Sequence, residues 1–139
     1  MNEVSNSTLA IAASVLIVLV IVAATFFAKR KPKKLKTDYF EKRWAELQKL
    51  CADKSTWPLA IIDADKLLDD ALKRRKYKGK TMGERLVSAQ RDISDNDSVW
   101  FAHKLRNRLV HEQTAPMKDT IVKDALKGIR QALRDLGAL

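Results

Sequence analysis

A short segment near the C-terminal end of the chain holds residue types that bind or cleave a phosphodiester. It is the hexapeptide 106–111, Arg-Asn-Arg-Leu-Val-His. Arginine carries a planar fork of donors that matches a phosphate, and histidine titrates near neutral pH. A permanent cation, an amide and an imidazole therefore lie close together in sequence, which is a minimal set of groups for phosphate chemistry.

Two other interpretations of these side chains compete with phosphate chemistry. In the first, His103 and Asn107 make local hydrogen bonds, and Arg106 pairs with an acidic residue such as Asp63 or Asp70, as in structural ion-pair networks. In the second, the histidines bind a metal. The chain has two histidines and we expect no carboxylate on their face, so we predict no metal site and no cofactor.

The elements that must position the hexapeptide are all predicted to be helices. Apolar residues recur with helical spacing after residue 37, and no alternating run long enough for a strand is present. The expected helices span residues 38–53, 56–76, 81–91, 98–112 and 118–136. Five helices with short links predict an all-α fold, an antiparallel four- to five-helix bundle.

Each helix should turn an apolar face to the core. We call the expected helix 98–112, which carries the hexapeptide, the motif helix. Its apolar face should hold Phe101, Ala102, Leu105 and Leu109, because these residues fall on one side of a helix that turns 100° per residue. In the second helix we expect four aspartates, Asp63, Asp65, Asp69 and Asp70, to lie largely opposite the apolar residues. Large apolar residues also interrupt the polar face of the motif helix, which favours contact with another helix or a second copy. We expect Trp100 to contact the surroundings of the motif.

The order of residues in the hexapeptide resembles the Arg-x4-His motif of the HEPN superfamily, a group of small helical bundles, with Asn directly after Arg as is common there. The short motif lies late in the expected bundle, as in that family, and the resemblance covers about residues 44–136. It implies a homodimer through the helix around 98–112 and, in the active members, a metal-independent endoribonuclease.

The resemblance also implies a role for each motif residue. Arg106 would bind and polarise the scissile phosphate, His111 would act as general base or acid, and Asn107 would orient one of them. The products would be a 2′,3′-cyclic phosphate and a 5′-hydroxyl end. His103 has no assigned role. The HepT-like toxin branch continues the motif to a Tyr, whereas this chain has Gln113 there.

The N-terminal region predicts a membrane anchor. Residues 6–28 hold no charge, and the apolar run 9–28 is long enough to cross a bilayer and contact membrane lipid. A basic flank follows it: Lys29, Arg30, Lys31, Lys33, Lys34 and Lys36. The positive-inside rule predicts a single-pass protein of the cell membrane, with its N-terminus outside and its C-terminal domain in the cytoplasm. The flank is also the predicted contact with anionic lipid headgroups.

The predicted organisation is a tail and transmembrane helix at 1–28, a basic juxtamembrane linker at 29–37 and a cytoplasmic bundle at 38–139. The formal net charge is +10, but six of the 27 basic residues lie in the flank, leaving 21 basic against 16 acidic residues, or +5, after it. This excess permits contact with RNA without requiring it. A weaker RNA-binding stretch is predicted at Lys73, Arg74, Arg75, Lys76 and Tyr77, where the tyrosine would stack on a base.

The sequence therefore predicts a membrane-anchored, HEPN-like helical domain that binds RNA and acts as a metal-independent endoribonuclease through Arg106 and His111. The alternative is a non-catalytic, membrane-tethered module that binds a protein partner or scaffolds a complex. A further alternative is a sensor of lipid surfaces, in which the basic flank is the functional part.

Overall fold

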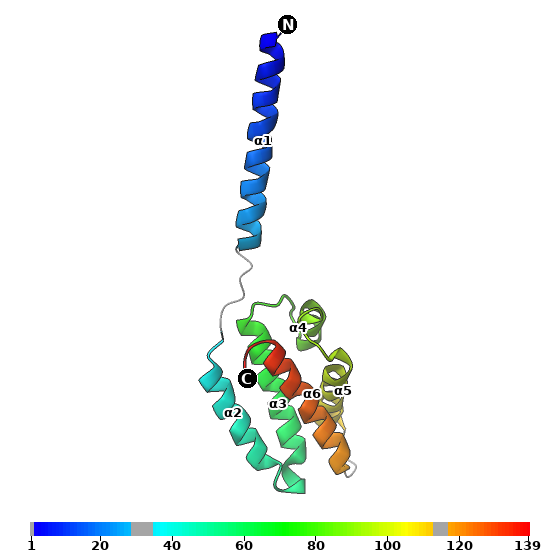
Figure 1. Ribbon diagram of the computed structural model, residues 1–139. Helices are drawn as coiled ribbons and strands as arrows, with labels where there is room; N and C mark the ends of the chain where they lie inside the picture. Colours follow the sequence, from blue (N-terminus) through cyan, green and yellow to red (C-terminus); the bar gives the residue numbers. More distant parts are fainter. Residues whose placement is uncertain (1, 29–34, 113–116) are drawn as a thin grey trace. The chain divides into compact units, whose positions relative to one another are not determined.

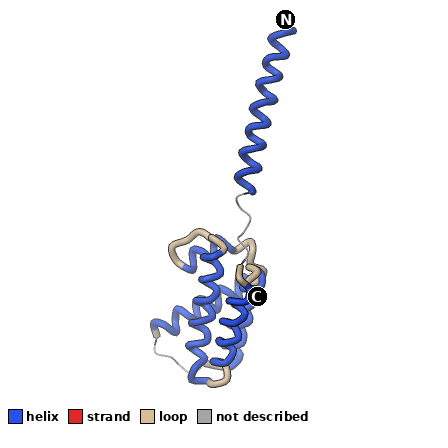
Figure 2. The backbone as a smooth tube through the Cα atoms, turned by 90° about the vertical axis from the view of Figure 1, so that its left-hand side faces the viewer, coloured by secondary structure: helices blue, strands red, loops and turns tan. Residues whose placement is uncertain are grey.

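The structure, a computed structural model, describes the backbone of residues 2–28, 35–112 and 117–139. The chain divides into two compact units, residues 1–32 and 33–139. All regular structure in the described residues is helical, as Figures 1 and 2 show, which confirms the predicted all-α class.

The N-terminal unit is formed by one helix, α1 (Asn2–Ala28). Its segment Thr8–Thr25 is long and apolar enough to cross a membrane, and none of it is buried. Two hydroxyls of this segment bond to backbone carbonyls one turn back, Ser14 to Ile11 at 2.8 Å and Thr25 to Val22 at 2.9 Å. These polar groups are thus satisfied within the helix, which is what a hydrocarbon environment demands.

The second unit contains five further α-helices, each within a few residues of its predicted position. They are α2 (Thr37–Leu50), α3 (Trp57–Arg74), α4 (Met82–Ala89), α5 (Asn96–His111) and α6 (Asp119–Asp135). A short 3-10 helix, η1 (Lys54–Thr56), precedes α3 and was not predicted.

Local capping residues explain where several helices begin and end. Thr81 accepts a hydrogen bond from the amide of Glu84 at the start of α4, and Asp95 does the same for Ser98 in α5. At the end of α6, Gly137 has a φ of +70° and donates its amide to Arg134. This left-handed residue closes the helix and lets the chain turn back onto the core.

Helix α3 is the centre of the second unit. It contacts α2, α4, α5 and α6, and Figure 1 shows it running between α2 and α6. Its inward face carries Ile61, Leu68 and Leu72, which have no exposed surface. Every other helix of this unit therefore buries its apolar face at least partly against α3.

The helical unit extends further toward the N-terminus than the predicted start at residue 38. Leu35 is buried with the core residues of the unit. The predicted linker at 29–37 thus overlaps the start of the unit. Five of the six basic residues predicted in the flank (Lys29, Arg30, Lys31, Lys33 and Lys34) lie outside the described residues. The sixth, Lys36, is exposed and directly precedes α2.

Candidate functional site

The hexapeptide occupies the last two turns of α5, whose inward face fixes the direction of its side chains. Val99, Ala102 and Leu105 are buried in the core. Phe101, predicted to join them, is instead 40 % exposed. It lies at the edge of the apolar stripe, about 100° from Ala102.

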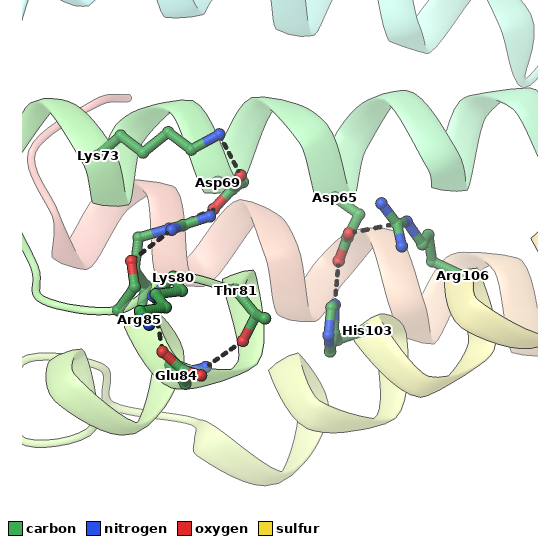
Figure 3. Close-up of polar contacts among 10 residues, drawn as sticks. Asp65, Asp69, Lys73, Lys80, Thr81, Glu84, Arg85, His103 and Arg106 are labelled. Carbon is green, nitrogen blue, oxygen red and sulfur yellow. Dashed lines mark hydrogen bonds and ion pairs between the residues drawn. The ribbon is translucent and has the colours of Figure 1, made fainter.

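A closed ring of four polar side chains joins α3 and α5. Asp65 of α3 is fully buried, and its Oδ1 lies 3.0 Å from Nδ1 of His103. Its Oδ2 lies 3.2 Å from Nε of Arg106. The ring closes on α5, because Arg106 Nη1 donates to Oδ1 of Asn107 at 2.8 Å and Nδ2 of Asn107 lies 3.4 Å from Nε2 of His103. Figure 3 shows Asp65 pointing between His103 and Arg106.

For a neutral His103, the contacts of the ring select one tautomer. The amide oxygen of Asn107 is used by Arg106, so its Nδ2 faces the imidazole as a donor, and Nε2 of His103 must accept. The ring proton of a neutral imidazole then lies on Nδ1 and is donated to Asp65. Trp100 packs edge-on against the same imidazole at 5.9 Å between ring centres, so it does contact the surroundings of the motif.

Arg106 is held at the surface of the domain, and Nη2 of its donor fork forms no hydrogen bond or ion pair with the described residues. Its side chain is 33 % exposed, whereas that of Asp65 is 1 % exposed. The Nε contact with Asp65 is a close ion pair without the alignment of a hydrogen bond. The carboxylate that Arg106 meets is Asp65, not Asp63 or Asp70, so the predicted partner was wrong. A guanidinium fixed on its Nε side can still offer its outer N–H groups to an anion.

His111 lies in the last turn of α5 and is exposed. It follows Arg106 by five residues, which places it about 140° further around the helix and about 7.5 Å along its axis. Val110 beside it is 53 % exposed. Arg106 and His111 of one copy therefore point to different sides of α5, whereas Asn107 and Arg108 lie on the face of His111.

The predicted RNA-binding stretch at the end of α3 is largely engaged in contacts within the domain. Three of its five side chains have acidic partners: Lys73 with Asp69 at 2.7 Å, Arg74 with Asp70 at 3.0 Å and Tyr77 with Asp92 at 2.6 Å. Burial and the hydrogen bond to Asp92 raise the pKa of Tyr77 to about 12. Arg75 is half-buried and Lys76 is exposed, so the structure does not present the five residues as one free basic surface.

A second ionic cluster lies one turn further along α3 (Figure 3). Arg85 of α4 is buried and contacts Asp69 through both Nε and Nη2 at 2.7 Å, and its Nη1 donates to the carbonyl of Gly79 at 2.8 Å. This cluster fixes the segment between α3 and α4 against the domain. The carboxylate of Asp69 is shared between Arg85 and Lys73.

The residue that sequence reasoning missed is Asp65, which was predicted to lie on the polar side of α3. The signal was present, because Asp65 follows Ile61 by four residues and precedes Leu68 by three, the spacing of one helix face. An aspartate on an apolar face predicts a buried partner of opposite charge.

The chain matches no family model, no curated protein and no solved structure.

Proposed function

We propose that this chain is a membrane-tethered, HEPN-like RNA-binding protein that cleaves single-stranded RNA without a metal ion. The observation that supports it best is the presentation of Arg106. The side chain is fixed by Asp65 and Asn107, keeps a third of its surface exposed and lies within the motif Arg-Asn-x3-His. A guanidinium ordered in advance loses little conformational entropy when it binds a phosphate.

In this proposal cleavage requires two copies of the chain. His111 points about 140° away from Arg106 around α5, so one copy does not direct both groups at the same phosphate. Two α5 helices packed against each other bring the His111 of one copy toward the Arg106 of the other. Exposed Val110 and half-buried Trp100 supply apolar surface for this contact. Arg106 would then stabilise charge on the phosphate, and His111 would move the proton of the attacking 2′-hydroxyl.

The proposal places α1 across the cell membrane and the helical unit in the cytoplasm. It is supported by the uncharged Thr8–Thr25 segment and by the basic residues that follow α1 in the sequence. A membrane confines the copies to two dimensions, which raises their effective concentration for pairing. A protease added to intact cells should leave the helical unit whole, and its digestion there would refute the topology.

The cleavage test uses the full chain in nanodiscs, single-stranded RNA and a chelator. We expect wild type to release products with 2′,3′-cyclic phosphate ends and His111→Ala to lose at least about 100-fold in rate, the usual contribution of a general base. Arg108→Ala is the matched control, because Arg108 is another exposed basic residue of the last two turns. Equal rates for wild type and His111→Ala would refute catalysis by the motif.

A non-catalytic interaction module is the second candidate, and one observation favours it. Asp65, His103, Arg106 and Asn107 already contact one another within a single copy, as expected for a structural network. This candidate predicts that wild type neither binds nor cleaves RNA, and that Arg106→Lys alters only the stability of the domain.

A further inference from the structure

A groove separate from the motif runs between α2 and α6. Its volume is about 360 Å³, near the lower end of the range of roughly 300–1,000 Å³ for small-molecule sites. Trp44 of α2 and Trp57 at the start of α3 line it, together with Val122 and Leu126 of α6. The groove therefore offers an aromatic and aliphatic surface that an apolar ligand would cover.

The basic residues at the rim of the groove are unequally neutralised along its length. Lys123, toward the N-terminal end of α6, pairs with Asp119 at 2.7 Å. Lys127 and Arg130 line the groove further along the helix, and neither lies within ion-pair distance of a described acidic side chain. Lys127 also interacts electrostatically with the more distant carboxylate of Asp95, which caps α5. The groove thus has a neutralised end near Val122 and a cationic end near Arg130. Val122 and Arg130, which mark these two ends, are about 12 Å apart along α6 at a rise of 1.5 Å per residue.

We propose that this groove binds a single-chain amphiphile, an alkyl chain with an anionic carboxylate or phosphate head. The chain lies against Trp44, Trp57 and Leu126, and the head lies between Lys127 and Arg130. A volume of about 360 Å³ accommodates one such chain, and the separation of apolar and cationic surface orients it. This site is independent of Arg106 and of the proposed RNA chemistry.

The chain contains three tryptophans, two of which line the groove, so occupancy has a direct optical signal. The Trp100→Phe variant of the full chain, in nanodiscs of zwitterionic lipid, leaves Trp44 and Trp57 as the only tryptophans of the chain, and selective excitation of indole reports on them. Titration with 11-bromoundecanoate should quench them with saturation, because bromine quenches an indole that it touches. The neutral 11-bromoundecanol should bind at least about tenfold more weakly, since it lacks the charge that Lys127 and Arg130 recognise.

The charged head group is tested by changing the cationic end of the groove. The double variant Lys127→Gln/Arg130→Gln should bind the bromo acid at least about tenfold more weakly than wild type. Arg134→Gln is the control, because Arg134 is an exposed residue of the same helix outside the groove, and this substitution should leave the binding unchanged. A bromoalkyl phosphate titrated in parallel distinguishes the two head groups. Quenching that does not saturate, equal binding of the alcohol or undiminished binding by the double variant would overturn the proposal.

A second measurement needs no substitution, because Cys51, the only cysteine of the chain, also lines the groove. Its thiol donates to the carbonyl of Leu47 at 3.6 Å, and burial raises its pKa. Decanoate should slow the alkylation of Cys51 by N-ethylmaleimide in wild type and much less in the double variant. Protection that rises with protein concentration in the absence of decanoate would mean that a second copy fills the groove, which would also overturn the proposal.

Discussion

The buried aspartate of α3 offers the sharpest test of how the helical unit is held together. Asp65→Asn keeps the shape of the side chain but removes the charge that Arg106 and His103 face. Arg106 then keeps a guanidinium close to the core without a counter-charge. Breaking a buried ion pair from one side costs about 3–5 kcal/mol. The side chain of Arg106 is one-third exposed and recovers part of its hydration, so we expect the lower end, about 3 kcal/mol.

The assay is urea unfolding of residues 33–139, followed by circular dichroism in the far ultraviolet. In a thermal melt followed by the same signal, a loss of about 3 kcal/mol would lower Tm by roughly 12 °C or more for a unit of about 100 residues. Asp63→Asn is the matched control. Asp63 lies on the same helix about 160° away from Asp65, is half-buried and forms no ion pair with the described residues. We expect its substitution to change the free energy of unfolding by less than about 0.5 kcal/mol.

A triple variant separates the effect of charge from the effect of packing. Asp65→Leu, His103→Leu and Arg106→Met together replace the polar contacts by apolar ones of similar size. Because such replacements are often neutral or stabilising, we expect the triple variant to be more stable than Asp65→Asn. The reasoning is refuted if Asp65→Asn unfolds within about 1 kcal/mol of wild type, or if the triple variant is the least stable of the set.

Two further predictions concern helix packing and titration. Gly128→Ala should destabilise the unit by about 1–3 kcal/mol, because the added Cβ would lie 2.9 Å or less from the side chain and backbone of Ser98. Gly83→Ala is the control, since its Cβ would lie 3.6 Å from the nearest neighbouring atom and should not destabilise the unit. Urea unfolding of the two variants compares their free energies of unfolding. In a Tyr39→Phe variant, Tyr77 is the only tyrosine, and its ionisation in the ultraviolet spectrum should occur at about pH 12. The contribution of Tyr77 to the free energy of unfolding should be complete below the unfolded pKa of about 10 and be lost as pH rises through about 12. Ionisation at about pH 10 would contradict the burial of Tyr77.

The helices were predictable because the signals that define them are local. The apolar period of α2 and the capping residue Thr81 lie within the segments that they organise, and the structure has helices at both places. The all-helical class follows from the same kind of signal. Boundaries differ by a few residues where a cap was misassigned, as at Asp95, which caps α5 so that the helix begins at Asn96, two residues before its predicted start.

The candidate site was less predictable because its contacts are not local. Asp65 and His103 are 38 residues apart in the chain, and nothing in either segment indicates that α3 and α5 place them together. The sequence placed Arg106, Asn107 and His111 on one helix, as found. Which acidic residue Arg106 meets depends on how that helix is rotated against α3, which is decided by packing of the whole core.

The position of Asp65 opposite two groups of α5 also restricts how these helices can be aligned. If α5 slid by one turn along α3, Asn107 and Val110 would take the places of His103 and Arg106, and no cation would face the carboxylate. A slide in the opposite direction would bring two apolar residues to it. Either shift would leave a buried charge unpaired, at a cost of about 3–5 kcal/mol. Apolar contacts between α3 and α5 alone discriminate poorly between neighbouring registers of the two helices. The carboxylate of Asp65 therefore selects a single register of α5 against α3.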